Sequence, residues 1–187
     1  MDKLPSGTVT FLFTDIEDST HLWQEQPEAM AQAHALHDQI LHEAIEANHG
    51  YVFQIVGDSF SVAFHNAIDG LKAALAAQRG LETMQNDSTL KIRARMGLHT
   101  GTAEIQSNGK YDGYVTVASC QRVMSVAYGG QVLLSHTTAD LFTDLPEGVS
   151  LRDLGEHQLK SLRSSLRLYQ LIAPGLPQDF PPIQSLN

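Results

Sequence analysis

The sequence predicts a single α/β domain, because segments with strand and helix patterns alternate along the chain without a long linker. The chain has 187 residues, of which 42% are hydrophobic and 18% are charged. A chain of this length and composition is expected to bury its own core and to be soluble and globular. It contains neither an internal repeat nor a low-complexity stretch.

The first quarter of the chain contains one predicted strand and one predicted helix. Residues 8–13 are mostly β-branched or aromatic, which predicts a strand, buried on both faces, that ends at Thr14 and Asp15. A helix is predicted from Pro27 to about residue 48, since proline suits a first helical position and Gly50 suits a helix end. Its apolar face would be formed by Met30, Ala33, Leu36, Ile40, Ala44 and Ile45.

A hairpin and a second helix follow. Residues 51–56 and 59–64 have strand composition, and only Gly57 and Asp58 separate them, which predicts a tight turn. Asn66 is a good helix cap, and the Ala- and Leu-rich segment after it predicts a helix over residues 67 to about 84.

Strand and helix patterns also alternate in the second half of the chain. Residues 91–98 predict a strand, and residues 102–107 a further one, because Asn108 and Gly109 form a strong hairpin signal. The remaining predicted elements are a helix over about 116–127, a strand over 131–135, a helix over 137–142, and strands near 151–154 and 168–172. Residues 174–187 contain four of the seven prolines, which predicts an extended tail or linker after a domain of residues 1–173.

The charge balance excludes several classes of function. Lys and Arg total 12, Asp and Glu total 21, and the formal net charge is −9. Non-specific nucleic-acid binding needs basic clusters, which are missing from the sequence. With one cysteine, Cys120, the chain has neither an internal disulfide framework nor a Cys-rich zinc site. No signal peptide and no apolar run of about 20 residues is present, so we expect a cytoplasmic protein without membrane contact.

Two carboxylates occupy positions that favour metal binding. Asp15 ends the first predicted strand, and Asp58 lies in the turn between the second and third. If these strands are neighbours, the two carboxylates converge at one end of a sheet and can hold Mg²⁺, which prefers hard oxygen ligands. In the alternative interpretation, Asp58 only forms the turn and Asp15 only caps a helix. The segment after Asp15 leaves a buried strand and enters a helix, where free backbone amides can bind phosphate or be ordinary capped helix-start groups.

Five stretches, in this order along the chain, resemble the signature motifs of class III adenylate and guanylate cyclases. They are residues 13–20, 55–60, 93–101, 129–135 and 154–160. Each motif alone is weak, but five in order are specific, and the resemblance covers about residues 7–173. It implies a ferredoxin-like βαββαβ core with extra C-terminal strands, and a cyclase homology domain over residues 1–173.

The resemblance also implies roles for individual residues. Two Mg²⁺ or Mn²⁺ ions per site would be bound by Asp15, Asp58 and the backbone carbonyl of Ile16. Lys160 falls on a phosphate-binding lysine of the family. The backbone amides that would hold triphosphate oxygens belong to Glu17, Asp18, Ser19 and Thr20.

The implied reaction is attack of the ribose 3′-oxygen of ATP, or less favourably GTP, on the α-phosphorus, which releases pyrophosphate. The site would lie between two subunits of a head-to-tail homodimer. One subunit would give the metal carboxylates and the other the base-reading and transition-state residues. In multidomain bacterial regulators such domains precede regulatory or effector domains, which predicts a further domain after the tail.

The chain departs from the family at the positions that read the base. In the family, a Lys or Glu stands three residues before the glycine of the first hairpin, and Gln54 stands there in this chain. A partner Asp stands three residues before a later glycine. With Gly113 as that glycine, the position is Lys110, and Asp112 lies nearby. The amide of Gln54 both donates and accepts, so it can pair with either purine.

The transition-state positions also differ. The family has Asn and then Arg, four residues apart on one helix face. Alignment backward from residues 129–130 places Arg122 in the Arg position and Ala118, which has no donor, in the Asn position. Alignment forward from residues 115–119 instead places Thr116 and Cys120 there. Asp18 replaces a glycine of the first motif and brings a negative charge near the phosphates.

The other reactive side chains are predicted to be structural. His34 and His37 lie one helical turn apart with His42 nearby, and without a second ligand motif they predict a solvated helix face. His99 is expected to be structural within its strand. Ser135 and His136 are expected to form a strand end and a helix cap, and Cys120 a small packed side chain.

Two functions from different classes therefore fit the sequence. The first is a nucleotidyl cyclase that makes a cyclic nucleotide. The second is a catalytically weak or inactive module that binds Mg-triphosphate and regulates an attached effector. Asp15 and Asp58 fit both, whereas Gln54, Lys110 and Ala118 favour the second. A cyclic-di-GMP synthase of related fold ranks last, because its G-G-D-E-F signature is absent.

Overall fold

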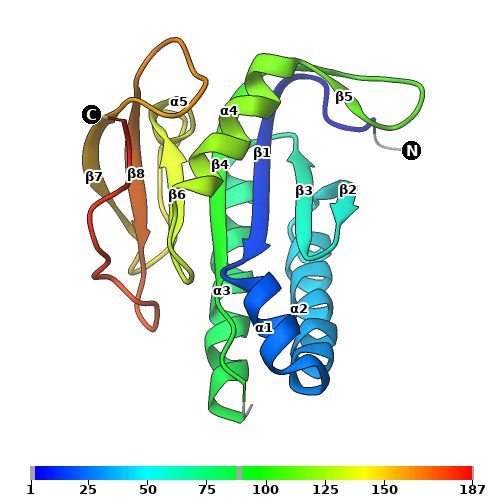
Figure 1. Ribbon diagram of the computed structural model, residues 1–187. Coiled ribbons are helices and arrows are strands. Elements are labelled where there is room, and N and C mark those ends of the chain that lie inside the picture. The colour runs from blue at the N-terminus through cyan, green and yellow to red at the C-terminus, as the bar shows by residue number, and fades with distance from the viewer. Residues whose placement is uncertain (1–2, 88–89, 187) are drawn as a thin grey trace.

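The computed structural model describes residues 3–87 and 90–186. Figure 1 shows helices and strands that alternate along the chain, as the sequence predicts. The strands are β1 (Gly7–Ile16), β2 (Tyr51–Val56), β3 (Ser59–Phe64), β4 (Ala94–Ile105), β5 (Tyr111–Asp112), β6 (Val132–Ser135), β7 (Ser150–His157) and β8 (Leu166–Ile172). The helices are α1 (Ser19–Glu25), α2 (Pro27–Ala47), α3 (Ala67–Asp87), α4 (Tyr114–Ser125) and α5 (His136–Ala139).

The strands form one sheet with the order β2-β3-β1-β4-β6-β8-β7, and β5 pairs with β4. The part β2-β3-β1-β4 is antiparallel and, with the helices between its strands, forms a ferredoxin-like βαββαβ core. β6 extends this core in parallel with β4, and β8 and β7 add two antiparallel strands. The predicted core and its extra C-terminal strands are therefore confirmed.

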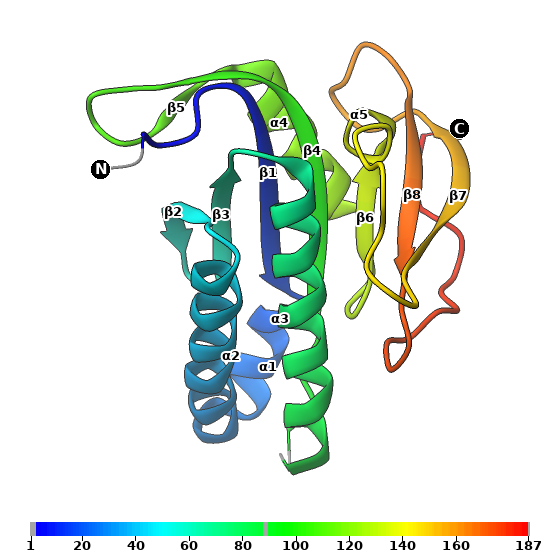
Figure 2. The ribbon, with the colours of Figure 1, turned by 180° about the vertical axis from the view of Figure 1, so that it is seen from behind.

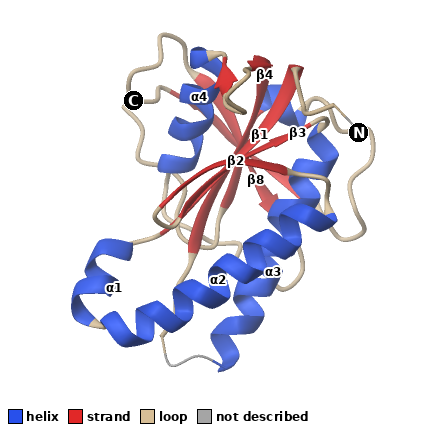
Figure 3. Ribbon diagram, turned by 90° about the vertical axis from the view of Figure 1, so that its right-hand side faces the viewer, coloured by secondary structure: helices blue, strands red, loops and turns tan. Residues whose placement is uncertain are grey.

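The helices form layers on both faces of the sheet. α2 and α3 cover one face and α4 covers the other, as the views from behind and from the side show (Figures 2 and 3). β1 lies inside the core sheet, and its residues 9–14 are buried on both faces, whereas Thr8, the first residue of the predicted segment 8–13, is exposed. One hydrophobic cluster joins the sheet to α2 and α3, and two smaller ones lie under α4. Ile16 at the end of β1 belongs to the first cluster and Phe13 to a cluster under α4, so this strand end is packed on both faces of the sheet.

The prediction of two separate strands over residues 91–98 and 102–107 is wrong. β4 is one continuous strand that pairs with β1 from Ala94 opposite Ile16 to Ala103 opposite Gly7. Its Gly97 does not end the strand but lets α4 approach, since an added Cβ would lie 2.5 Å from the backbone nitrogen of Met124. The other predicted elements are present, with ends that shift by a few residues; β1, for example, continues to Ile16.

We expect Gly97→Ala to destabilise the fold by about 1–3 kcal/mol, because the new methyl group meets rigid helix backbone. The midpoint of urea unfolding measures this. Gly70→Ala is the matched control, since the atoms nearest to its Cβ would all belong to side chains, those of Leu98, Thr10 and Phe64, at 3.1, 3.2 and 3.5 Å. Equal midpoints for Gly97→Ala and the wild type would contradict the close packing of α4 on β4.

Residues 174–186 contain neither helix nor strand and fold back over the sheet. Leu176 is buried in the main hydrophobic cluster, and Ile183 packs against the cluster under α4. None of the helices in the described ranges is long and apolar enough to cross a membrane.

Candidate active site

The structure brings Asp15 and Asp58 to one end of the sheet. β1 and β3 are antiparallel, with Thr14 opposite Phe60, so the end of β1 lies beside the turn that precedes β3. The backbone N–H of Ile16 donates a hydrogen bond of 3.2 Å to Oδ2 of Asp58. The topology therefore produces the convergence that the sequence predicts.

Arg95 was not among the predicted site residues, yet it makes the strongest contact with this pair. It lies opposite Asp15 on β4, and its Nε donates to Oδ1 of Asp15 at 2.7 Å. Its Nη2 forms an ion pair with Oδ2, and its Nη1 donates to the carbonyl oxygen of Ser125 at 3.1 Å. The hydrogen bonds to Asp15 raise the pKa of Arg95 above its ordinary value. The position of Arg95 in the motif of residues 93–101 was the available signal.

The carboxylates fit a hard divalent cation that keeps several non-protein ligands. Among the described residues there is no group of three or more His, Cys, Asp or Glu side chains that could enclose a metal ion. Two carboxylates with a nearby backbone carbonyl suit Mg²⁺ or Mn²⁺, which are commonly bound by one or two carboxylates together with water and substrate phosphates. They do not suit a closed structural site.

The loop between β1 and α1 presents backbone amides beside the carboxylates. Asp18 has φ 59°, in the left-handed region, which explains why a glycine suits this position and why Asp is tolerated there. The amide of Glu17 is not free as predicted, because it donates to the carbonyl oxygen of Arg93 at 2.9 Å. Within the described chain, the amides of Asp18, Ser19 and Thr20 have no hydrogen-bond acceptor. Three of the four predicted amides are thus available to a phosphate.

Arg122 and Lys160 come together in the structure. Arg122 is half-buried on α4, and Lys160 is exposed in the segment between β7 and β8. Both line one cavity of about 250 Å³. Neither side chain forms an ion pair with any described residue. Two uncompensated cations in one cavity suit an anionic ligand.

The buried side of α4 decides between the two alignments of this helix. Cys120 is fully buried, and its thiol donates to the carbonyl oxygens of Phe11 and Gly97 at 3.5 Å. Burial raises the pKa of this thiol, as expected for a packed side chain. Thr116 is buried and donates to the carbonyl oxygen of Thr102 at 2.8 Å. Both side chains point into the protein and bond to strand carbonyls, so the geometry favours the alignment with Ala118 and Arg122.

The two positions expected to read the base lie on different elements, and Lys110 lies far from the carboxylates. Gln54 is exposed on the edge strand β2, directly after an irregularity in its pairing with β3. Lys110 is exposed in the hairpin between β4 and β5, at the Gly7 end of β1, whereas Asp15 lies near the opposite end. A strand rises about 3.3 Å per residue, so Lys110 and Asp15 are separated by roughly 25–30 Å. One copy of the chain cannot bring them together.

The prediction of a solvated helix face for the histidines of α2 is wrong for His37. Its side chain is fully buried, its Nδ1 lies 2.9 Å from Oδ1 of Asp38, and its Nε2 has no partner among the described residues. Its ring stacks on His34, with ring centroids 6.0 Å apart, and packs edge-on against Phe60. Burial lowers the pKa of His37. The helical spacing already placed His37 on the apolar face of α2. The sequence prediction treated it as exposed because histidine is polar.

His99 is structural, as expected. It is buried, and its Nδ1 lies 2.6 Å from the hydroxyl of Ser135, which ends β6 and precedes α5. Burial, with a smaller effect from the nearby His136, lowers the pKa of His99 from 6.5 to about 4. The folded state therefore holds this imidazole neutral.

Acid should destabilise the fold through His99. The unfolded chain takes up the proton near pH 6.5, before the folded state does, so stability present above pH 6.5 is lost as the pH falls to about 4. The expected loss is about 3 kcal/mol. Urea unfolding at pH 7 and pH 4.5 measures it, with His99→Gln as the variant that cannot titrate. If both proteins lose the same stability, His99 is not the group responsible.

The comparisons with known proteins agree with this geometry. The model of a family described as adenylate and guanylate cyclase catalytic domain matches residues 1–173. An uncharacterised protein of Mycobacterium tuberculosis is 43% identical over 185 residues, which are 97% of this chain and 61% of the relative. The chain thus spans less than two thirds of that relative. A receptor-type adenylate cyclase of Trypanosoma brucei brucei is 29% identical over 215 residues, covering 92% of this chain and 18% of the relative.

Solved structures show the same fold. Adenylate cyclase from Trypanosoma brucei, described in its monomeric state, has a TM-score of 0.84 and 26% identity, with 100% of this chain and 98% of the other covered. An adenylyl cyclase of P. aeruginosa has a TM-score of 0.78 and 21% identity, covering 91% and 96% of the two chains.

Proposed function

Because the chain belongs to the family of adenylate and guanylate cyclase catalytic domains, we propose that it converts ATP, or less favourably GTP, to the 3′,5′-cyclic nucleotide and pyrophosphate. The observation that carries the proposal is the convergence of Asp15 and Asp58 at one strand end beside three free backbone amides. This arrangement offers hard oxygen ligands and phosphate donors in one place.

The chain's own residues have distinct tasks in the proposed reaction. The ribose 3′-hydroxyl loses its proton to solvent, its oxygen forms a bond to the α-phosphorus, the bond from that phosphorus to the bridging oxygen breaks, and pyrophosphate leaves. Two Mg²⁺ or Mn²⁺ ions, bound by Asp15, Asp58 and the carbonyl of Ile16, would neutralise phosphate charge and ease formation of the 3′-oxyanion. Arg95 holds the Asp15 carboxylate in a fixed orientation.

In the proposed complex, the triphosphate contacts backbone amides and two cationic side chains. The amides of Asp18, Ser19 and Thr20 donate to triphosphate oxygens. Lys160 neutralises phosphate charge, and Arg122 stabilises the charge that builds on the α-phosphate in the transition state. Gln54 and Lys110 are the side chains left to contact the base.

We propose that the site is formed by a homodimer. Because Lys110 lies at the far end of β1 from Asp15, a site that uses both residues takes them from two copies, which we propose are related head to tail. Exposed apolar side chains support such an interface. Tyr114 and Val115 at the start of α4 are 84% and 74% exposed, and Val56 on the edge strand is 63% exposed.

We expect dimerisation in the presence of Mn²⁺ and ATP, and we expect Tyr114→Asp to weaken it. Sedimentation velocity measures the dimer fraction. Leu141→Asp is the matched control, since Leu141 is also exposed, at 53%, but lies beyond α5. A protein that stays monomeric at high concentration with metal and nucleotide present would exclude a shared site.

Binding is the first test of the proposed function. Isothermal titration with ATP and with GTP, each with Mg²⁺, Mn²⁺ or EDTA, should show binding that depends on the divalent cation. Binding that is equal in EDTA, or no binding of either nucleotide with metal, would contradict the proposal.

A second function is supported by the departures from the family pattern. Ala118 has no donor, and Gln54 and Lys110 differ from the family's base-reading residues. These changes favour a module that binds Mg-triphosphate and regulates an attached effector with little or no turnover. The greater length of the mycobacterial relative is compatible with such an effector in a longer chain. Nucleotide binding without cyclic product would distinguish this function.

A further inference from the structure

We propose that residues 178–186, here called the C-terminal strap, form an intramolecular cover over the half-buried Arg122, and that this cover must move before the cation reaches a polyphosphate held beside the exposed Lys160. The inference rests on the proposed function for the role of the two cations. The strap itself is defined by contacts that do not depend on that function.

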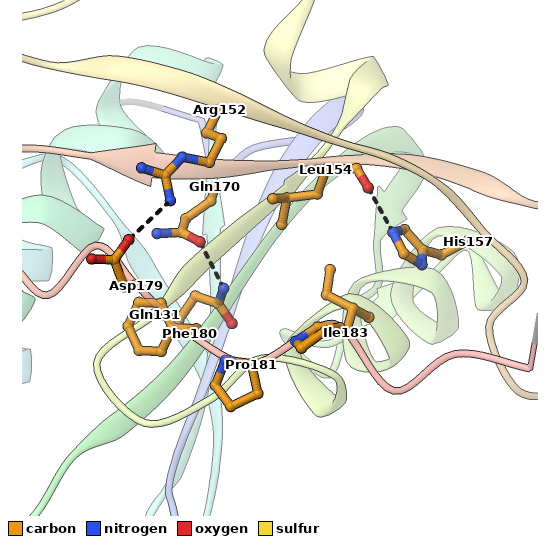
Figure 4. A pocket seen from close by; sticks show the side chains of 10 residues that line it. Gln131, Arg152, Leu154, His157, Gln170, Asp179, Phe180, Pro181 and Ile183 are labelled. Carbon is orange, nitrogen blue, oxygen red and sulfur yellow. Dashed lines mark hydrogen bonds and ion pairs between the residues drawn. The ribbon is translucent and has the colours of Figure 1, made fainter.

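The first half of the strap is fastened to the outer strands. The carbonyl oxygen of Gln178 accepts hydrogen bonds from Arg152 at 2.9 Å and from Gln170 at 2.8 Å. Asp179 lies 3.8 Å from the Arg152 guanidinium, and Figure 4 shows these two side chains facing each other. These contacts lead the chain from β8 toward α4.

The middle of the strap is anchored beside α4. The ring of Phe180 stacks on Tyr128, with ring centroids 6.3 Å apart, and the Tyr128 hydroxyl donates to the carbonyl oxygen of Pro182 at 2.9 Å. Ile183 packs against the cluster formed by Val123, Ala127, Leu133, Leu159 and Leu168. Ile183 is thus the apolar anchor of the strap.

The end of the strap lies beside the cations. The hydroxyl of Ser185 is 3.0 Å from Nδ1 of His157, and the N–H of Leu186 donates to the carbonyl oxygen of Gln158 at 2.9 Å. The strap residues Gln184, Ser185 and Leu186 line the same cavity as Arg122 and Lys160. Gln184 also lines a second cavity, of about 240 Å³, together with Glu17 and Arg95. Gln184 therefore borders both the cavity of the two cations and the cavity at Arg95, the partner of Asp15.

The chemistry of the strap suits a cover that a ligand can displace. Its only charged residue is Asp179, which is fully exposed and lies near Arg152, so the strap places no carboxylate beside Arg122 or Lys160. A polyphosphate would supply the missing charge and form stronger, charge-assisted hydrogen bonds. The apparent affinity for the ligand then falls by the fraction of molecules in which the strap is open.

The experiment uses a substitution that weakens the attachment of the strap to the rest of the chain. Ile183→Asp places a charge in the apolar anchor site, and Leu141→Asp makes the same kind of change at an exposed position beyond α5. Phenylglyoxal labelling, followed by peptide mass spectrometry, reports the accessibility of Arg122 without any nucleotide. Arg163, which is exposed, serves as the internal reference.

We expect Ile183→Asp to speed labelling of Arg122 but not of Arg163, and to tighten binding of ATP with Mn²⁺ by about tenfold. Lys160→Ala should weaken binding by the same factor in the Ile183→Asp background and in the wild type, because Lys160 is exposed with the strap in place. Leu141→Asp should change none of these values.

Unchanged Arg122 labelling in Ile183→Asp would overturn the proposal, and so would weaker nucleotide binding, which would make the strap part of the site. Faster Arg122 labelling without nucleotide binding by any variant would support the cover and contradict the proposed function.

Discussion

Asp15→Asn and Asp58→Asn are each expected to weaken metal-dependent binding of ATP by more than about 100-fold and to remove turnover. The substitution keeps the shape of the side chain but removes the negative charge that a hard divalent cation requires. Even changes that only support a metal ligand typically cost 10–100-fold in affinity, so loss of a ligand is expected to cost more. In Asp15→Asn, Arg95 also loses its ion-pair partner.

Asp153→Asn is the matched control for this pair of variants. Asp153 forms a similar ion pair, with Arg167, but on the exposed surface of β7 and β8. Its substitution should leave nucleotide binding unchanged. Titration calorimetry with Mn²⁺ and ATP measures all three variants, and wild-type affinity in both Asp15→Asn and Asp58→Asn would exclude the metal site.

Ala118→Asn is expected to raise the rate of cyclic nucleotide formation by about 10²–10³-fold, with little change in binding. The family has an amide donor at this position of the helix, one turn before the Arg, and a donor aimed at transition-state charge contributes about that factor. Ala118 and Arg122 share a helix face, since they are four residues apart. Because the donor acts in the transition state, turnover should change more than affinity.

Thr116→Asn is the control that tests the other alignment of the helix. Thr116 is buried and bonded to Thr102, so an Asn there cannot reach a nucleotide and should only destabilise the helix. A rate increase in Thr116→Asn instead of Ala118→Asn would reverse the assignment. If neither variant is faster, the missing donor does not limit the rate, and the changes at Gln54 and Lys110 become the better explanation.

The sequence predicted the family, the ferredoxin-like core and the convergence of the carboxylates. These features depend on short-range patterns, such as the tight turn at Gly57 and Asp58, and on motifs that occur in a fixed order. The single long strand β4 was missed because its glycines resemble strand ends. They are in fact positions where α4 packs closely on the sheet, which only the three-dimensional arrangement shows.

The missed side chains were those whose roles depend on distant partners. Arg95 matters because the antiparallel register places it opposite Asp15, 80 positions away in the chain. His37 is buried by Phe60 and His34, although histidine is usually polar and exposed. The strap was predicted only as an extended tail, because its proline content indicates conformation and not the surface against which it packs.

Product analysis tests the central proposal most directly. Purified protein is incubated with ATP or GTP and with Mn²⁺ or Mg²⁺, and cyclic nucleotide and pyrophosphate are both quantified. A cyclase should release them in equal amounts, at a low rate in the wild type, at a higher rate in Ala118→Asn, and not at all in Asp15→Asn. Metal-dependent nucleotide binding without cyclic nucleotide in either the wild type or Ala118→Asn would contradict the assignment as an enzyme.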